Sequence, residues 1–438
     1  MVAEPPLLPG RCPVKRGLNI VGFVRAELGI GEAARLLVAA VKAAGIPYAV
    51  VPVEKFAPSR HEHPFSDFGT GEPTYDVNII VLNPPELVGF AGDDGGALLN
   101  GRYTIGNWWW EVTQFPDSMR IATHLVDEVW VGSTHVADAV APALLKPVLT
   151  FRVPITRPSV QPVDRTRFGV LSDRFFFLFT FDFHSIFQRK NPLAVVEAFQ
   201  TAFTPGEGPH LVVKSINGVN RPQELGQLEE AAAERPDIHV VDGYVTADEQ
   251  HGLIAACDAY VSLHRAEGLG LTMAEAMAFA KPVIATGYSG NLEFMSSANS
   301  HLVPYELTTI PAGCDPYPEG GEWAEPDLEA AAALMRRVYE HPADARELGE
   351  RARLDIERLH SPRARAQFLA TRLDSIEREW SARASGFRRR IERPSAAMRI
   401  RRRVGGLAFN VWYRLPASAR RLVRPLAVAL ATRTLRRP

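Results

Sequence analysis

The sequence predicts an α/β protein built from two doubly wound, Rossmann-like domains of parallel sheet that face each other across a cleft. A chain of 438 residues exceeds the size at which a single hydrophobic core usually stops growing. Short apolar runs alternate with helix-prone stretches in both halves of the chain. These runs are nearly continuous in apolar residues, as in parallel strands that helices cover on both faces. Two such units in succession predict two domains and a cleft between them.

The predicted elements follow the same order in both halves. Strands of the first half are expected at residues 18–23, 77–82, 102–106 and 128–133, with a helix from about Glu32. Strands of the second half are expected at 175–181, 211–214, 238–241, 259–263 and 282–286, with a helix after Pro192. The proline-rich stretch 152–172, which has no sustained period, predicts the boundary between the two units.

Four segments result from this boundary. They are a first domain over residues 1–160, a second domain over 161–365, a closing helix over 366–386 and an arginine-rich tail over 387–438. Within the second domain, residues 305–327 are crowded with Pro and Gly and predict a long loop.

Composition excludes several classes of protein. No run of about eighteen apolar residues is present to span a bilayer, and the N-terminus lacks a basic end followed by an apolar stretch. A cytoplasmic protein is therefore expected. Cys12, Cys257 and Cys314 lie far apart, so we expect inert thiols rather than a disulfide framework or a zinc site. The HEH at 61–63 has no further ligands at metal spacing, and no metal site is predicted.

The tail differs sharply from the rest of the chain. Residues 388–438 hold fifteen Arg, no Lys and one acid, which makes +14, so the remainder carries −1 − 14 = −15. Apolar residues recur there at helical spacing: Ile400, Val404, Leu407, Val411 and Leu415. A basic amphipathic helix is typical of binding to an anionic membrane surface. The alternatives are docking on the acidic body or disorder; nucleic acid is less favoured, because no folded reading module accompanies the tail.

The stretch HRAEGLGLTMAEAMAFAKP, residues 264–282, predicts an anion site. It follows the strand expected at 259–263 with a loop and then a helix, at the edge of a parallel sheet where ligands bind. Gly268 and Gly270 would let the backbone approach a phosphate, and the amides of Leu271 and Thr272 would point at it. A nucleoside diphosphate suits this arrangement.

Charged side chains around this loop extend the hypothesis. Glu267 and Glu275, eight positions apart, could hold the hydroxyls of a sugar and a ribose, or could be ordinary surface glutamates near a helix start. Arg189 and Lys190 lie between a strand end and the helix that Pro192 opens. Such a pair can neutralise a departing diphosphate, or can be a solvated pair of surface cations.

Two motifs of the first domain remain. In GFVRAELGIGEAARLL, Gly29 and Gly31 do not fit the spacing of a dinucleotide loop, so no nicotinamide or flavin is expected; the loop could instead pack over a sugar diphosphate or an acceptor. The cluster NWWWE, residues 107–111, places three tryptophans in a row. An aromatic platform for an acceptor sugar and a pair of core tryptophans beside one surface tryptophan are both consistent with it.

Taken together, these segments resemble the retaining glycosyltransferases of family four, which have the GT-B fold. The likeness is carried by EGLGLTMAEAMAFAKPVIATGYSGNLEF, FHSIFQRKNPLAVVEAF, VVDGYVTADEQHGLIAACDAYVSLHR and GIGEAARLL, and spans about residues 17–380. It implies Arg189 and Lys190 on the diphosphate, Glu267 on the donor sugar and Glu275 on the ribose. It also implies sugar transfer with retention and no bound metal or other cofactor.

The resemblance adds further candidates. Those for the donor are Gly29, Gly31, His184, Lys214, Asn217, Tyr244, Val245 and the segment Gly268, Leu269, Gly270, Leu271 and Thr272. Many relatives carry a histidine at the end of a first-domain strand, where this chain reads IGNWWWE, so acceptor geometry and the identity of the sugar stay open. The acceptor candidates are Asn107, Trp108, Trp109 and Glu111.

The implied activity is transfer of a hexose, of mannosyl or rhamnosyl type, from a nucleotide sugar to a saccharide or lipid-linked acceptor in cell-surface polysaccharide assembly. Two alternatives stay open. One is a sugar-nucleotide epimerase of the same architecture, and the other is a non-catalytic subunit that binds nucleotide sugar. An epimerase would turn over donor alone, which distinguishes it from a transferase.

Overall fold

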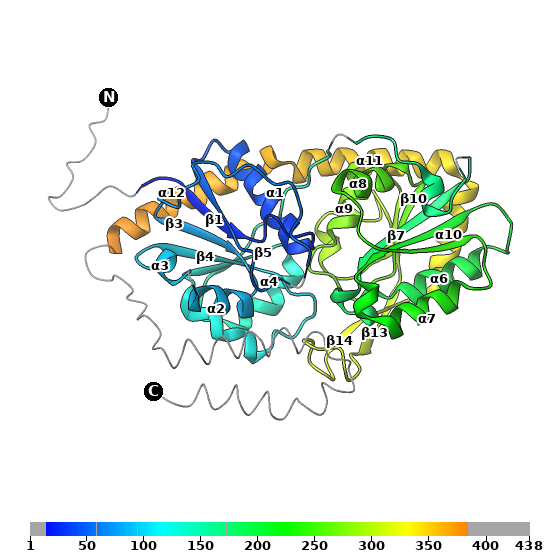
Figure 1. Cartoon of the computed structure of the whole chain (residues 1–438), viewed down its shortest axis with the longest axis horizontal. Coiled ribbons are helices and arrows are strands. Elements are labelled where there is room, and N and C mark those ends of the chain that lie inside the picture. The colour runs from blue at the N-terminus through cyan, green and yellow to red at the C-terminus, as the bar shows by residue number, and fades with distance from the viewer. Residues whose placement is uncertain (1–14, 58, 94, 159, 172, 384–438) are drawn as a thin grey trace.

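Two parallel sheets form the body of the protein. The computed structural model describes residues 15–57, 59–93, 95–158, 160–171 and 173–383. Within these ranges the chain forms two six-stranded parallel sheets side by side, each covered by helices on both faces (Figure 1). The predicted fold class is confirmed.

The first sheet has the strand order β2-β1-β3-β4-β5-β6. Its strands are β1 (Leu18–Gly22), β2 (Tyr48–Pro52), β3 (Val77–Val81), β4 (Tyr103–Trp108), β5 (Glu128–Val131) and β6 (Val148–Thr150). Helix α1 (Gly29–Ala43) covers one face, and α2 (Pro84–Gly92) covers the other with α4 (Thr134–Val140) (Figure 1). Strands β1, β3, β4 and β5 are buried along their whole length, which explains their unbroken apolar runs.

The second sheet has the order β12-β11-β10-β7-β8-β9. Its strands are β7 (Phe176–Asp182), β8 (His210–Ile216), β9 (Ile238–Asp242), β10 (Ala259–Ser262), β11 (Val283–Thr286) and β12 (His301–Val303). Helices α6 (Pro192–Ala202), α7 (Pro222–Ala232) and α10 (Leu328–Glu340) cover one face. Helices α8 (Ala247–Ala256), α9 (Leu271–Ala278) and α11 (Pro342–His360) cover the other (Figure 1).

The predicted long loop over residues 305–327 is wrong. The segment forms an antiparallel hairpin of β13 (Tyr305–Thr309) and β14 (Glu322–Pro326). The Pro and Gly residues that suggested a loop are concentrated in the connection between the two strands. Burial of Trp323 stabilises the hairpin, because this side chain packs in the same core as tryptophans of the first domain. We call residues 305–326 the hairpin arm.

The last described helix returns to the first domain. Helix α12 (Pro362–Arg383) packs against α1, and Arg372 forms an ion pair with Glu128 of β5, whose side chain is completely buried. None of the helices in the described ranges is both long and apolar enough to cross a bilayer. The predicted amphipathic helix of the tail lies outside the described residues.

Candidate active site

The predicted site residues gather where the carboxyl ends of the two sheets meet. The second-domain residues come from β8 and from the segments that follow β7, β8, β9 and β10. The first-domain residues come from the first turn of α1, which begins at Gly29 rather than after the predicted glycine loop, and from the end of β4 with the residues that follow it. In open α/β folds this edge is the usual place for ligands. Several hydrogen bonds cross between the domains here, so the two edges are in direct contact.

Glu267 lies at the centre of this region between two cations. Lys190 Nζ bonds to Glu267 Oε1, and Arg189 Nη1 lies 3.2 Å from Glu267 Oε2. Burial alone raises the pKa of Glu267, but Lys190 and Arg189 outweigh that effect and lower it to about 2. Glu267 is therefore a carboxylate at every physiological pH.

Arg189 and Lys190 differ in what else they contact. Arg189 also donates through Nη1 to the Ala266 carbonyl at 2.7 Å and through Nε to the Ser185 carbonyl at 3.2 Å. Its side chain is 5% exposed, against 17% for Lys190. Arg189 thus holds the loop in place, whereas Lys190 is the more accessible cation for a ligand.

The glycine loop leads into α9 in the predicted way. Gly270 has φ +85°, a left-handed conformation that favours glycine, and α9 begins at the next residue. The first amides of a helix have no partner within it, so those of Leu271 and Thr272 are available to an anion. The Leu269 side chain is buried in the core.

Gly268 serves a further purpose that the sequence did not indicate. A Cβ atom at this position would lie 2.9 Å from the carbonyl oxygen of Trp110 in the first domain. A Cβ atom on Gly290 would lie 2.2 Å from the carbonyl oxygen of Gly268. Gly268 thus allows the donor loop to pack directly against the first domain, and Gly290 allows close packing of the donor loop within the second domain.

Glu275 projects from α9 toward the first turn of α1. Burial is the main cause that raises its pKa to about 8; the charge of Glu32 also raises the pKa, and Arg35 opposes both effects. Gly31 packs tightly, since a Cβ there would lie 2.6 Å from the Ala26 carbonyl, whereas Gly29 has open space around it. The first turn of α1 therefore lies near the residue predicted to bind ribose.

A polar cluster follows β7, β8 and β9. Lys214 is buried and donates to the carbonyls of Ser215, at 2.8 Å, and Gly243, and burial lowers its pKa to about 8. Asn217 donates to Asp182 Oδ1 at 2.8 Å and accepts from the Tyr244 hydroxyl at 3.0 Å. Val245, the next residue, is partly buried.

His184 adds an unsatisfied polar atom to this cluster. It follows β7, and its backbone N–H donates to Asp182 Oδ1 at 2.9 Å. Its Nδ1 atom is buried without a hydrogen-bond partner in the structure. A buried polar atom of this kind usually finds its partner in a ligand or an ordered water.

The NWWWE segment requires a correction. Trp108 is 0% exposed and stacks on Phe115, so it belongs to the core and cannot present its ring to an acceptor; Trp110 is buried as well. Asn107 is also buried, and its Oδ1 accepts from Trp109 Nε1 at 2.9 Å. β4 continues through Trp108, which sends these side chains alternately into the two faces of the sheet.

Trp109 and Glu111 are the two members of the segment that reach the centre. The Trp109 ring lies close to Gly132 of the first domain and Gly268 of the second, where added Cβ atoms would lie 2.8 and 3.7 Å from it. Glu111 Oε2 accepts a hydrogen bond of 2.8 Å from the hydroxyl of Tyr317 on the hairpin arm. Both Glu111 and Tyr317 interact electrostatically with Arg189.

Sequence reasoning missed several residues that organise the site. Besides Tyr317, Ser289 accepts a 2.8 Å bond from the backbone N–H of Glu267, and Ser133 donates a 2.7 Å bond to the Gly268 carbonyl. Arg152 pairs with Glu293 at 2.7 Å across the domains. An isolated serine or tyrosine in a loop carries no spacing signal, so nothing in the sequence marks them. Across the described ranges, no group of three or more metal-binding side chains is found.

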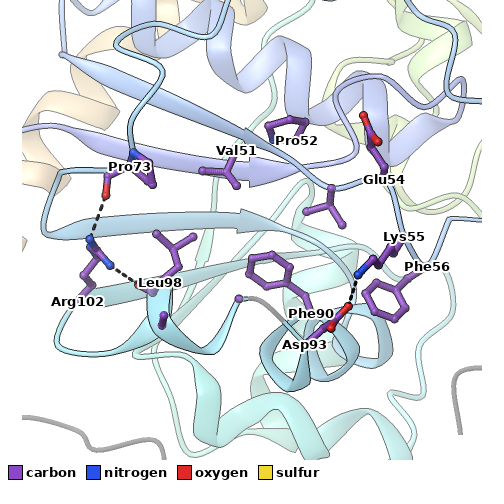
Figure 2. A pocket seen from close by; sticks show the side chains of 13 residues that line it. Val51, Pro52, Glu54, Lys55, Phe56, Pro73, Phe90, Asp93, Leu98 and Arg102 are labelled. Atoms are coloured by element: carbon purple, nitrogen blue, oxygen red, sulfur yellow. Dashed lines mark hydrogen bonds and ion pairs between the residues drawn. The ribbon is translucent and has the colours of Figure 1, made fainter. Parts of the chain in front are cut away.

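A separate hollow of about 720 Å³ lies in the first domain, beside the end of β2 (Figure 2). Its polar groups already have partners. Arg102 donates to the carbonyls of Leu98, Pro73 and Tyr75, and Lys55 pairs with Asp93 at 2.5 Å. The predicted donor and acceptor residues do not line this hollow, and we assign it no role.

Comparison with known proteins agrees with this architecture. Residues 177–309 match the family model described as Glycosyl transferases group 1. Among solved structures, the chain is similar to HepE from Anabaena, in complex with UDP and glucose, at 13% identity and a TM-score of 0.58 over 82% of this chain and 100% of that chain. It is also similar to sucrose-phosphate synthase from Thermosynechococcus elongatus, at 16% identity and a TM-score of 0.58 over 83% of this chain and 100% of that chain. A glycosyltransferase from Rickettsia africae is similar at 14% identity and a TM-score of 0.55 over 82% of this chain and 98% of that chain.

No curated protein matches the sequence. The structural likenesses establish the fold: two facing Rossmann-like domains of the GT-B class. The family match covers the second domain alone, where residues 177–309 resemble the glycosyl transferases group 1.

Proposed function

We propose that this protein is a retaining, metal-independent hexosyltransferase that uses a nucleotide-sugar donor. One observation carries the proposal. Lys190, Arg189 and Glu267 meet beside the free amides of α9, which places two cations, one carboxylate and a helix N-terminus within one site. This is the set of groups that a diphosphate linked to a polyhydroxyl sugar would use.

In this proposal the site is held in a charge-neutralised state before donor binds. The donor diphosphate competes with Glu267 for Lys190, and Glu267 is then released to accept hydrogen bonds from sugar hydroxyls. As the bond to the sugar breaks, negative charge grows on the departing diphosphate. Lys190 and the amides of Leu271 and Thr272 stabilise that charge, an effect that is often the largest contribution to catalysis.

The proposal needs no nucleophile from the protein. The acceptor attacks from the face that the diphosphate leaves, and the phosphate takes up the acceptor proton. Lys190 and Arg189 bring two positive charges to the diphosphate of the donor. The residues present therefore fit a reaction without a resident metal. Glu275, opposite Glu32, would bind the ribose hydroxyls.

The substrates are proposed at the level of class. HepE is described in complex with UDP and glucose, which makes UDP-glucose the first probe, with a mannosyl donor next because of the sequence resemblance. The acceptor would be a saccharide or a lipid-linked saccharide used in cell-surface polysaccharide assembly. We place the protein in the cytoplasm, where residues 388–438 would bring it to an anionic membrane surface.

Donor consumption followed by mass spectrometry and NMR tests this function. The protein is incubated with UDP-glucose, GDP-mannose and the other nucleotide hexoses, with and without octyl hexosides as acceptor probes. Transfer or slow hydrolysis that releases nucleoside diphosphate supports the proposal. Conversion to an epimeric nucleotide sugar would identify an epimerase. Binding without turnover of any donor would indicate the binding subunit.

A further inference from the structure

We propose that Arg60, in the first domain, is a positioning residue for the nucleoside end of the donor site, and that it acts through Tyr244 of the second domain. The proposal rests on the proposed function and goes beyond it, because no motif and no family match includes residue 60. It is carried by a chain of contacts that crosses from one domain to the other.

Arg60 is fixed on the first-domain side by Glu27. Its Nε and Nη2 atoms donate to the two oxygens of the Glu27 carboxylate at 2.5 and 2.9 Å. Two further bonds join the segments: the Glu27 N–H donates to the Arg60 carbonyl at 3.0 Å, and the Ser59 hydroxyl donates to the Glu27 carbonyl at 3.1 Å. A bidentate pair of this kind fixes both the position and the plane of the guanidinium.

The orientation imposed by Glu27 places Arg60 over Tyr244. The guanidinium carbon lies 4.6 Å from the centre of the tyrosine ring, within the range of a cation–π interaction. The Tyr244 hydroxyl donates to Asn217, and Asn217 in turn donates to Asp182 at the end of β7. The ring is therefore held at both ends, by the first domain at its face and by the second domain at its hydroxyl.

The position of Tyr244 in the sheet assigns this contact to the nucleoside. The diphosphate groups, Lys190 and the α9 amides, follow β7 and β10, which are neighbours. Asn217 and Tyr244 follow β8 and β9, on the far side of β7. If the phosphates of a nucleotide bind at the ends of β7 and β10, its base can extend past β8 to Tyr244, which follows β9.

A further feature supports a ligand in this region. Lys214 is buried beside Gly243, the residue before Tyr244, and its ammonium group bonds to two backbone carbonyls. An ammonium group has three donors, so one remains for the oxygen atoms of a base or ribose. Arg60 would then close the first-domain wall of a pocket whose other walls belong to the second domain, and nucleoside binding would be coupled to contact between the domains.

Titration calorimetry separates this role from a merely structural one. The titrants are the nucleoside diphosphates UDP, GDP, ADP and dTDP, and inorganic pyrophosphate, which contains the phosphates without the nucleoside. The proteins are wild type, Arg60→Ala and Arg25→Ala. Arg25 is a matched control, because it removes one positive charge from the neighbouring loop, where its partner Glu54 is largely exposed.

We expect Arg60→Ala to weaken the affinity for the preferred nucleoside diphosphate by about three- to ten-fold, the size of one cation–π contact together with its effect on the order of the Tyr244 ring. The affinity for pyrophosphate should change by less than about two-fold. Arg25→Ala should leave both affinities unchanged. Equal weakening of both titrants, or no change in either, would overturn the proposal. If wild type binds pyrophosphate but none of the nucleotides, the proposed function fails and the role of Arg60 fails with it.

A double-mutant cycle tests whether Arg60 acts through Tyr244. Tyr244→Leu should itself weaken the affinity for the nucleotide. Adding Arg60→Ala to that variant should then weaken the affinity by less than about two-fold more. Full additivity of the two effects would show that Arg60 does not act through the ring. The melting temperature of each free protein is recorded, and Arg60→Gln replaces Arg60→Ala if the alanine variant does not fold.

Discussion

The Tyr317 hydroxyl donates a 2.8 Å hydrogen bond to Glu111, which joins the hairpin arm of the second domain to the NWWWE segment of the first across 206 residues of sequence. Trp110 packs edge-on against the Tyr317 ring, with 5.3 Å between ring centres. The bond therefore orients a first-domain carboxylate that interacts electrostatically with Arg189.

Tyr317→Phe should test the importance of this bond. The ring and its packing on Trp110 remain, so we expect a loss of about 1 kcal/mol in the free energy of unfolding, the usual net value of one hydrogen bond. Nucleotide release from the donor should slow about ten-fold, or 1.4 kcal/mol in the barrier, if Glu111 must be held in place. Tyr288→Phe is the control, since the contacts described for Tyr288 are made through its ring and its backbone. Equal rates for both variants would contradict a role for the bond.

Lys190→Ala removes the accessible cation of the site. We expect at least a 100-fold fall in kcat/KM, on the order of 3 kcal/mol of transition-state stabilisation. Lys42→Ala breaks a similar but exposed pair with Asp67, and should leave the kinetics unchanged. Steady-state rates of nucleotide release decide the matter; an active Lys190→Ala enzyme would place the diphosphate elsewhere.

Glu275→Gln should change how stability depends on pH. The pKa of Glu275 is raised from an unfolded value near 4.5 to about 8, so the folded state loses stability as pH rises through this interval. The glutamine variant has no such loss. Its advantage in free energy of unfolding should grow between pH 4.5 and 8, on the order of 2–4 kcal/mol in total, and stay constant above.

Denaturant unfolding of wild type and variant at several pH values measures this difference. Glu229→Gln, an exposed position on α7, is the control and should show no pH-dependent gain. A gain for Glu275→Gln that is the same at pH 4.5 and pH 8.5 would show that burial does not raise the pKa of this carboxyl.

Gly290→Ala should disturb the donor loop. The added Cβ atom would lie 2.2 Å from the Gly268 carbonyl oxygen, so the backbone must shift. We expect a loss of more than about 2 kcal/mol in stability together with weaker nucleotide binding. Gly226→Ala on α7 meets no atom within 4 Å and should instead stabilise by about 0.5–1 kcal/mol. Thermal unfolding of both variants gives the comparison.

Arg372→Ala should weaken the attachment of α12. Glu128 is completely buried and also accepts from Trp130 Nε1 at 2.8 Å, so loss of the arginine leaves a buried charge without its cation. The expected cost is about 3–5 kcal/mol. Arg353→Ala, which breaks surface pairs on α11, should cost less than about 1 kcal/mol. Similar melting temperatures for the two variants would contradict the importance of this contact.

The fold could be predicted because its strands are nearly continuous apolar runs. The apolar runs at residues 77–82 and 259–263 predict buried parallel strands, and the glycine loop predicts the helix that follows it. The prediction lacks β2, β6 and β12; β6 and β12 have three residues each, which carry no periodic signal. The sequence predicts a loop over the hairpin arm because the Pro and Gly residues of its connection outweigh the weak pattern of the two strands that flank them.

The site could be predicted only where residues follow one another in a motif. Glu267, Gly270 and Lys190 have this property, and the structure brings Lys190 and Glu267 into contact although 77 positions separate them. Glu111 and Tyr317, or Arg60 and Tyr244, meet only through the packing of two domains. Such contacts depend on tertiary geometry, which spacing along one chain does not encode.

A thermal-shift screen of wild type and Glu275→Ala against UDP, GDP, ADP, dTDP and their hexose conjugates tests whether this protein binds a nucleotide sugar. A ligand that binds only the folded state stabilises it by about 2.7 kcal/mol at a hundred times its Kd. We expect one nucleotide and its sugar conjugate to raise the melting temperature of wild type, and Glu275→Ala to lose this shift. No shift with any nucleotide, in a folded wild-type protein, would contradict a nucleotide-sugar site between these domains.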